Sequence, residues 1–121
     1  MNAKFESVFT ELRAILARNV GSLSVTEDSS TRYCLEGGRH PKRGTPISIA
    51  WVQVDKAYVS FHHMGIYARP ELLKGISRGL RGRMQGKSCF NFTAVNAELF
   101  VELEALSVRG FEVLRNSPFT K

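Results

Sequence analysis

The chain has 121 residues, enough for one domain but not for a second hydrophobic core. Hydrophobic residues make up 43% and charged residues 23%, which is an ordinary globular composition. The hydrophobic content is therefore too high to predict a disordered chain. The apolar runs are only a few residues long, so the sequence predicts no transmembrane helix. We therefore expect a single α+β domain over residues 1–121.

The N-terminal residues lead into an amphipathic stretch with Glu6 and Glu11, which is unlike the apolar core of a signal peptide. The two cysteines, Cys34 and Cys89, are too few for a disulfide scaffold or a cysteine-only structural zinc site. Both features predict a cytoplasmic protein with reduced thiols.

The formal net charge of +6 is unevenly distributed along the chain. Residues 69–87 carry a net charge of +5 and residues 39–43 a net charge of +3, and both segments are rich in glycine. A basic surface attracts phosphates, nucleic acids and other anionic partners. The alternative interpretation is an ordinary solvated surface that keeps the protein in solution.

A long helix is predicted over residues 2–19, because the apolar side chains recur with a period of 3.6 residues. Asn19 and Gly21 are expected to end it. A second long helix is predicted over about residues 97–109, with Asn96 as its N-cap and Gly110 as its C-cap.

Two short helices are predicted between the strands. Pro70 begins the first, which Gly75 ends. Ser77 caps the second, which is expected to continue through Met84 and to end at Gly86.

Alternating side chains predict strands over residues 23–27, 32–36, 47–54, 57–63 and 87–93. The third has two apolar faces, one of them formed by Ile47, Ile49 and Trp51, which favours a central position in the sheet. Asp55 and Lys56 are predicted to form a two-residue hairpin turn.

In the last predicted strand, Phe90 and Phe92 are expected to point inward and Cys89 and Asn91 outward. The element order α-β-β-β-β-α-β-α implies a mostly antiparallel sheet of about five strands. The N- and C-terminal helices are expected to pack on one of its faces.

Histidine and cysteine side chains are the candidates for metal ligands. His62 and His63 are adjacent on a strand and face opposite sides, and His40 lies in a loop. Cys34 and Cys89 are both expected on outward faces. They are either two unrelated thiols or, if their strands are neighbours, a pair that can bond or bind a metal.

The sequence contains no G-x-S-x-G, HExxH or Walker A motif, and its carboxylates form no evident catalytic pair. We therefore predict no catalytic residues and no cofactor, and whether the chain is an enzyme stays open, with a non-enzyme favoured.

The candidate anion-binding residues are Arg78, Arg81, Arg83 and Lys87. Positions 78 and 81 are neighbours on one helix face. Trp51, Tyr58 and Tyr67 are candidates for stacking on nucleic acid, although no known nucleic-acid-binding signature accompanies them.

Three stretches carry a family resemblance: residues 56–62 (KAYVSFH), 67–73 (YARPELL) and 86–92 (GKSCFNF). They resemble the YdhG-like family, small bacterial proteins largely of unknown function with a frataxin-like α+β fold. Lys56, Tyr58, Ser60 and Phe61 match a motif of that family. The resemblance implies the fold.

Some members of that family are described as iron-chaperone-like by analogy with frataxin, which binds iron on an acidic ridge. The first helix here has only Glu6 and Glu11, countered by Lys4, Arg13 and Arg18, so iron binding is not transferred. We predict a bacterial, cytoplasmic, non-enzymatic binding or adaptor protein. Its basic surface is expected to bind an anionic ligand, a nucleic acid or an acidic protein, with a homodimer as a further expectation and metal handling as the alternative function.

Overall fold

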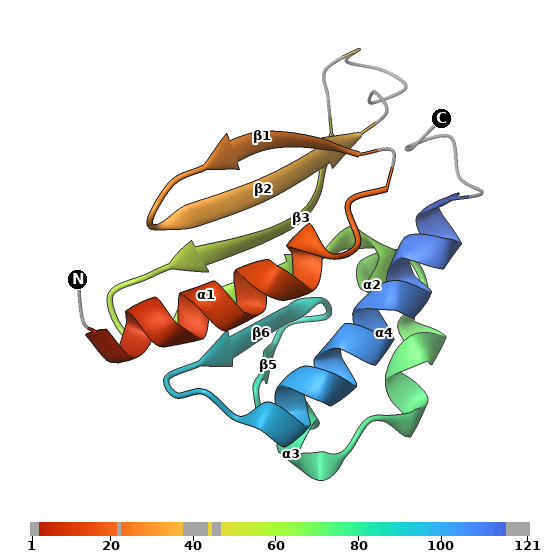
Figure 1. Ribbon diagram of the computed structural model, residues 1–121. Helices are drawn as coiled ribbons and strands as arrows, with labels where there is room; N and C mark the ends of the chain where they lie inside the picture. The colour runs from red at the N-terminus through yellow and green to blue at the C-terminus, as the bar shows by residue number, and fades with distance from the viewer. Residues whose placement is uncertain (1–2, 22, 38–43, 45–46, 116–121) are drawn as a thin grey trace.

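The computed structural model describes residues 3–21, 23–37, 44 and 47–115. Six strands form one antiparallel sheet in the spatial order β1-β2-β3-β4-β6-β5 (Figure 1). They are β1 (Ser24–Asp28), β2 (Arg32–Gly37), β3 (Ile47–Val54), β4 (Val59–His63), β5 (Met84–Gln85) and β6 (Cys89–Phe92). The helices are α1 (Ala3–Ala17), α2 (Met64–Ala68), the 3-10 helix η1 (Pro70–Gly75), α3 (Arg78–Arg81) and α4 (Ala97–Arg115). The predicted α+β class is confirmed, but the sheet has six strands rather than five.

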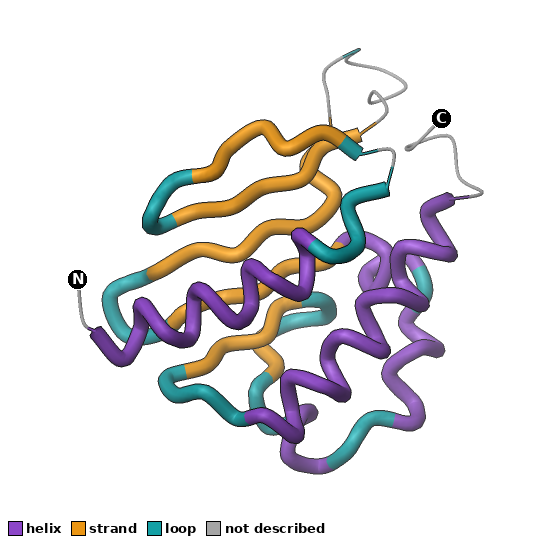
Figure 2. The backbone as a smooth tube through the Cα atoms, viewed as in Figure 1, coloured by secondary structure: helices purple, strands orange, loops and turns teal. Residues whose placement is uncertain are grey.

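The two long helices, α1 and α4, lie on the same face of the sheet, as predicted (Figures 1 and 2). Between these helices and the sheet lies the hydrophobic core. The predicted stripe of the first helix supplies buried residues to it, among them Val8, Leu12 and Leu16. Phe90 and Phe92 of β6 point into the same layer and are buried, which confirms their predicted orientation.

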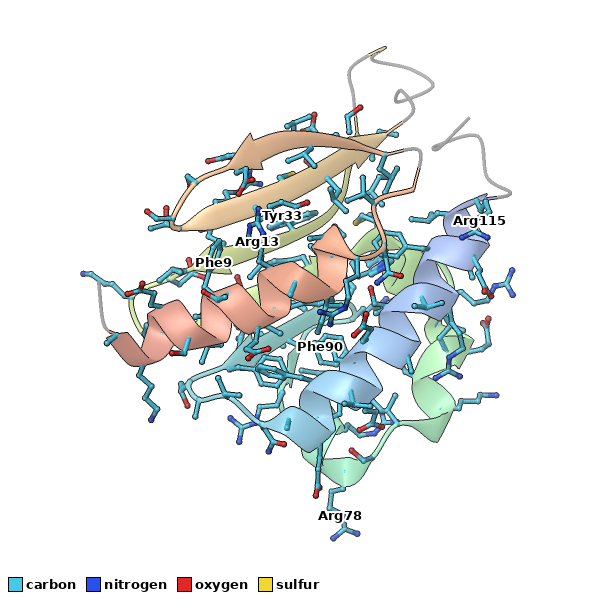
Figure 3. All side chains as sticks on the ribbon, viewed as in Figure 1. Phe9, Arg13, Tyr33, Arg78, Phe90 and Arg115 are labelled. Atoms are coloured by element: carbon cyan, nitrogen blue, oxygen red, sulfur yellow. The ribbon has the colours of Figure 1, made fainter. Side chains whose placement is uncertain are left out.

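Arg13 joins α1 to the β1–β2 hairpin. Its guanidinium donates two hydrogen bonds to the carboxylate of Asp28, at 3.1 and 2.8 Å. The same guanidinium lies 4.6 Å from the centre of the Tyr33 ring (Figure 3). The helix is therefore held against the hairpin by a bidentate ion pair and a cation–π contact.

A β-bulge in β3 changes the predicted faces of that strand. Leu35 pairs with Ala50, but its neighbour Glu36 pairs with Ser48, so Ile49 is the extra residue. Ile49 is buried in the core together with Ala50, whereas Trp51 points to the opposite face of the sheet. The prediction that Ile49 and Trp51 share a face is therefore wrong. The central position predicted for the strand is confirmed.

The turn between β3 and β4 is longer than the two residues predicted. Val54 pairs with Val59, and the backbone N–H of Asp55 donates to the carbonyl of Tyr58 at 2.8 Å. Asp55 is therefore paired with Tyr58 across the turn, so the predicted turn residues Asp55 and Lys56 are not its two central residues.

The helix that begins after Ser77 is shorter than predicted. The Ser77 side chain accepts a hydrogen bond from the N–H of Leu80, which confirms the cap, but the helix ends at Arg81. Glycine at 79 and 82 disfavours continuation. Met84 instead pairs with Phe90 in the sheet, and Gly86 forms the β5–β6 turn with a φ of 76°.

The last helix extends beyond its predicted end. Asn96 accepts a hydrogen bond from the N–H of Leu99, as predicted, but Gly110 lies inside α4 rather than at its C-cap. Phe111 and Leu114 continue the helix and are buried. Gly110 is needed there because a neighbouring ring packs against its Cα.

None of the helices in the described part of the chain combines the length and apolar character that a bilayer crossing requires.

Candidate functional site

The sheet face opposite α1 and α4 carries a row of side chains from four neighbouring strands. Cys34 of β2 pairs with Trp51 of β3, and Trp51 pairs with His62 of β4. His62 in turn pairs with Cys89 of β6. The indole and imidazole rings are stacked, with centroids 4.6 Å apart and planes at 14°. Directly opposed residues on one face are close neighbours, so the strand register creates this row.

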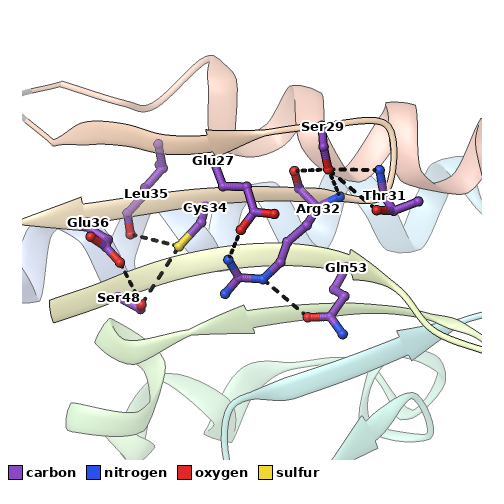
Figure 4. A network of polar contacts seen from close by, with 9 residues as sticks. All are labelled: Glu27, Ser29, Thr31, Arg32, Cys34, Leu35, Glu36, Ser48 and Gln53. Carbon is purple, nitrogen blue, oxygen red and sulfur yellow. Dashed lines mark hydrogen bonds and ion pairs between the residues drawn. The ribbon is translucent and has the colours of Figure 1, made fainter.

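A second, hydrogen-bonded row lies beside the first. Gln53 pairs with Ser60, and Ser60 pairs with Asn91. The carboxylate of Asp55 accepts hydrogen bonds from the Ser60 hydroxyl at 3.1 Å and the Gln53 amide at 3.0 Å. Toward β2, Arg32 donates to the side-chain oxygen of Gln53 at 3.3 Å (Figure 4). The polar groups of this face are thus fixed largely by one another.

Side chains of the two rows line a shallow hollow of about 490 Å³. The lining residues are Trp51, Gln53, Asp55, Tyr58, Ser60, His62, Gln85 and Cys89. The hollow is open to solvent rather than an enclosed cavity. Asp55 is the only acidic residue among them, and the Arg32 guanidinium lies beside the hollow, bonded to Gln53.

Cys89 and His62 form the closest pair of potentially reactive groups in this hollow. The Sγ atom of Cys89 lies 3.7 Å from Nε2 of His62 and 3.4 Å from Oδ1 of Asn91. Burial lowers the pKa of His62, an effect that the Asp55 charge opposes and Arg32 reinforces. Burial, with a smaller contribution from Asp55, raises the pKa of Cys89. At neutral pH the pair is therefore an uncharged imidazole beside an uncharged thiol.

These electrostatics are unsuited to nucleophilic catalysis. The thiolate is the attacking species, and reactive cysteines have a pKa lowered by a nearby cation or a helix N-terminus. The pKa of Cys89 is shifted in the opposite direction. Cys89 therefore lacks the lowered pKa of an activated nucleophile.

The four positions of the family motif lie in three different environments. Tyr58 and Ser60 line the hollow. Phe61 is buried in the core, and Lys56 is exposed in the β3–β4 turn. Two of the four predicted positions therefore belong to the hollow.

The three predicted arginines lie on and just after α3. Arg78 and Arg81 are the first and last residues of that helix, Arg83 follows it, and all three are exposed. The Arg81 guanidinium donates to the carbonyl of Leu73 at 2.6 Å. This bond places the Arg81 guanidinium beside η1, in which Lys74 is also exposed.

Lys87 is exposed but lies at the other end of the β5–β6 hairpin. The N–H of Asn91 donates to the carbonyl of Arg83 at 2.8 Å, so Arg83 is opposite Asn91. Lys87 precedes Asn91 by four residues, which corresponds to roughly 13 Å of extended chain. The predicted surface therefore consists of three arginines at one end of the hairpin and a lysine at the other.

The two adjacent histidines face opposite sides of the sheet, as predicted. His62 lines the hollow, and His63 is fully buried against α4. His40 and the basic loop 39–43 lie outside the described residues.

The two cysteines share a sheet face but are not neighbours. β3 and β4 lie between their strands, which separates Cys34 from Cys89 by three strand spacings, or roughly 14 Å. That distance excludes a disulfide or a shared metal ion. Cys34 is also buried, and both thiols are free.

The three aromatic candidates for stacking are divided between two places. Trp51 and Tyr58 are partly buried at the hollow, whereas Tyr67 lies on α2 with 53% of its surface exposed. No group of three or more His, Cys, Asp and Glu side chains is arranged for metal binding within the described residues.

The proximity of His62, Trp51 and Cys89 could not be derived from the sequence pattern. Alternation gives the outward orientation of Cys89, but it does not reveal that β6 pairs with β4. Comparisons with protein-family models, with curated proteins and with solved structures find no match to this chain.

Proposed function

We propose that this chain is a non-enzymatic binding protein that holds an anionic partner through the basic segment around α3. One observation carries the proposal. Arg78, Arg81 and Arg83 are exposed and form no ion pair with a carboxylate of the described residues, whereas Arg13 and Arg18 are each paired with one. Unpaired positive charges on one segment raise the local potential and attract anions.

An anion is expected to meet the arginine side chains rather than the N-terminus of α3. The Glu102 carboxylate accepts hydrogen bonds from the backbone N–H and the hydroxyl of Ser77, both at 2.6 Å. The helix start is therefore already occupied by a carboxylate. The Arg78 side chain extends away from the body of the protein (Figure 3), which leaves its guanidinium accessible.

Guanidinium groups recognise phosphate and carboxylate oxygens through paired hydrogen bonds. The partner is accordingly an anionic ligand, a nucleic acid or an acidic protein that presents such groups. Membership of the YdhG-like family, a bacterial origin and a cytoplasmic location stay predictions from the resemblance and the sequence, as does a homodimer.

The alternative function, iron handling by family analogy, has less support. The exposed acidic residues of α1 are Glu6 and Glu11, and Arg18 near the end of α1 is paired with Glu104. Hard cations such as iron need clustered oxygen ligands, and that helix offers few. We expect Fe(II) binding no stronger than that of a generic protein surface, measured by calorimetry.

Heparin chromatography tests the proposed function. We expect the variant Arg78→Gln/Arg81→Gln/Arg83→Gln to elute at clearly lower salt than the wild type, because charge pairing is screened by salt. The matched control is Arg109→Gln/Arg115→Gln together with Lys4→Gln, which removes the same formal charge elsewhere. Arg115 lies at the opposite end of α4 from Arg78 (Figure 3).

Equal shifts for the variant and the control would show that net charge alone determines retention, and would contradict the proposal. A third variant, Arg39→Gln/Lys42→Gln/Arg43→Gln, tests the other basic segment. If it abolishes retention while the α3 variant has no effect, the proposed surface is wrong. Thermal melts of all variants verify that fold stability is matched.

A further inference from the structure

We propose that the anionic partner of the basic segment is a single-stranded nucleic acid, an inference that rests on the proposed function and specifies its partner. The phosphates of the strand meet the cations of η1 and α3, and one base stacks on the ring of Tyr67. The surface that binds it, here named the α2–α3 surface, comprises residues 67–83. Its three short helices, α2, η1 and α3, each pack against α4 (Figure 1).

The α2–α3 surface carries an excess of accessible positive charge. Its only acidic residue is Glu71, and its cations, all of them exposed, are Arg69, Lys74, Arg78, Arg81 and Arg83. The ion pair between Arg69 and Glu71 is 3.5 Å long and joins side chains that are 57% and 63% exposed, so it contributes little. The other four cations form no ion pair with a carboxylate of the described residues. A chain of phosphates can therefore approach them without displacing a strong internal partner.

Tyr67 adds an aromatic ring that no neighbouring side chain covers. It is the only exposed aromatic residue in the described part of the chain, with 53% of its surface accessible. Within those residues it makes no hydrogen bond and no ring contact. Its helix is held in place, because the N–H of Gly65 donates to His63 Nδ1 and the N–H of Arg69 donates to the Gly65 carbonyl. The ring is thus presented to solvent from a fixed turn of backbone.

An exposed aromatic ring among cations favours a single strand over a duplex. The bases of a single strand present faces that stack on aromatic side chains, while its phosphates meet lysine and arginine. In a duplex the bases are stacked on one another, so the Tyr67 ring would find no free base face. The surface also lacks a long helix for the major groove, since α2 and α3 have five and four residues.

Arg81 connects the cations of α3 to the segment that bears Tyr67. Its guanidinium donates to the carbonyl of Leu73 at 2.6 Å, which directs this side chain from α3 onto η1. A guanidinium has five N–H donors, so others remain for a phosphate. Leu73 follows Tyr67 by six residues, which can extend over at most about 20 Å. A strand of twelve nucleotides, with a rise of about 3.4 Å each, is long enough to meet both.

Fluorescence anisotropy with a labelled strand of twelve deoxythymidines tests the proposal. The matched probe is an abasic strand of the same length, which has the same phosphates but no bases. We expect the wild type to bind the thymidine strand about 5- to 150-fold more tightly, the range for one base stacked on an aromatic side chain. A duplex of the same length and polyglutamate are the competitors, and we expect both to bind more weakly than the thymidine strand.

Variants of Tyr67 separate stacking from charge. Tyr67→Ala should abolish the preference for the thymidine strand over the abasic strand, and Tyr67→Leu should do the same because leucine has no aromatic face. Tyr67→Phe should retain the preference. Val101→Ala is the matched control, because it truncates another exposed apolar side chain, 72% accessible, on the side of α4 that faces α1. Since Tyr67 is exposed, all these variants should melt at the wild-type temperature.

The salt dependence of binding identifies the phosphate contacts. For a single strand, each contact contributes about −0.7 to the slope of log K against log salt concentration. Arg83→Gln should therefore make the slope less steep by about 0.7 and weaken the thymidine and abasic strands equally. Tyr67→Ala should leave the slope unchanged. A slope unchanged by Arg83→Gln and by Arg78→Gln would contradict the placement of phosphates on these side chains.

Three results would overturn the proposal: equal affinity of the wild type for the thymidine and abasic strands, tighter binding of the duplex, or tighter binding of polyglutamate. Quenching of Trp51, the only tryptophan, would also overturn it, because that side chain lies on the open face of the sheet, away from α4.

Heparin separates this proposal from the proposed function, because heparin has no bases. Tyr67→Ala should therefore keep the heparin retention of the wild type. If the triple arginine variant loses retention while strands with and without bases bind equally, the proposed function holds and only the single-stranded partner is wrong. If that variant elutes with its charge-matched control, both proposals are wrong.

Discussion

The imidazole ring of His63 packs directly against the Cα atom of Gly110, so close that a Cβ at position 110 would lie 2.8 Å from Cε1 of the ring. The ring also accepts a hydrogen bond at Nδ1 from the N–H of Gly65, at 3.1 Å. Its Nε2 atom therefore carries the proton and donates to the carbonyl of Ser107 at 3.1 Å. One buried side chain thus joins the end of β4 to α2 and α4.

This contact predicts that Gly110→Ala destabilises the protein although alanine is the better helix former. The helix would gain about 1 kcal/mol from alanine. The new methyl group would lie 2.8 Å from a fully buried ring, and such overpacking costs about 1–3 kcal/mol. We expect a net loss in the free energy of unfolding, measured by urea denaturation.

Gly82→Ala is the control for that experiment. Gly82 has right-handed helical backbone, with a φ of −66° and a ψ of −15°, and the nearest atoms to a new Cβ are 3.5 Å away. Alanine there is expected to stabilise the fold by about 0.4–1 kcal/mol, because it restricts the unfolded chain. If both substitutions stabilised the protein equally, the packing of His63 against Gly110 would be wrong.

His63 also predicts a pH dependence of stability. Burial lowers its pKa to about 4, against 6.5 in an unfolded chain. The unfolded state therefore binds a proton that the folded state rejects whenever the pH lies between these values. The contribution of His63 to stability is complete above pH 6.5 and is lost as the pH falls from 6.5 to 4. The loss amounts to about 2 kcal/mol at pH 5.

Urea denaturation at pH 7, 6 and 5 measures this loss. The lowered carboxyl pKa values of Asp28 and Glu104 also make stability fall as the pH decreases. These carboxyl groups take up protons mainly below pH 4.5, so they contribute little between pH 7 and 5. The pKa of His62 is also lowered, and the variant His62→Asn removes its contribution to the pH dependence of stability. A wild-type stability that does not change between pH 7 and 5 would contradict the buried, uncharged state of His63.

Elements with a strong local pattern could be predicted from the sequence. The apolar stripe of α1 and the alternation of Phe90 and Phe92 depend on residues close together in the chain, and both are confirmed. The cap formed by Asn96 is also local and is confirmed. In these cases the periodicity of burial and the side-chain chemistry agree.

Features that depend on distant residues could not be predicted. Gly110 has the sequence signature of a helix end, but the ring of a residue 47 positions earlier keeps it inside α4. Ile49 enters the core through a bulge, which a strict alternation does not reveal. The pair formed by His62 and Cys89 depends on which strands are neighbours in the sheet, and local spacing does not specify that.

Phe92→Ala tests the core beneath β6. Phe92 is buried, and its ring meets that of Phe100 edge to face, with centroids 4.9 Å apart. Truncation of a buried phenylalanine costs about 3–5 kcal/mol. Val101→Ala, at a position of α4 with 72% of its surface exposed, should change stability by less than about 0.5 kcal/mol. A thermal melt of Phe92→Ala that matched the wild type would disprove the strand and its orientation.

Two buried serines give the last prediction, because the hydroxyl of one has a hydrogen-bond partner and that of the other has none among the described residues. Ser107 is fully buried, and its Oγ atom has no hydrogen-bond partner among the described residues. The hydroxyl of Ser60 is 3.1 Å from the Asp55 carboxylate and donates to it. A buried polar group without a partner costs about 1–3 kcal/mol, whereas a satisfied one stabilises by about 1 kcal/mol.

We therefore expect opposite signs for the two alanine variants. Ser107→Ala should be neutral or should raise the free energy of unfolding, because it removes an unsatisfied hydroxyl and leaves the backbone carbonyl that accepts from His63 intact. Ser60→Ala should lower it, because the Asp55 carboxylate loses a donor while its own environment is unchanged. Urea denaturation at pH 7 measures both. A loss for Ser107→Ala as large as that for Ser60→Ala would mean that the Ser107 hydroxyl has a bound partner, such as a buried water molecule, in solution.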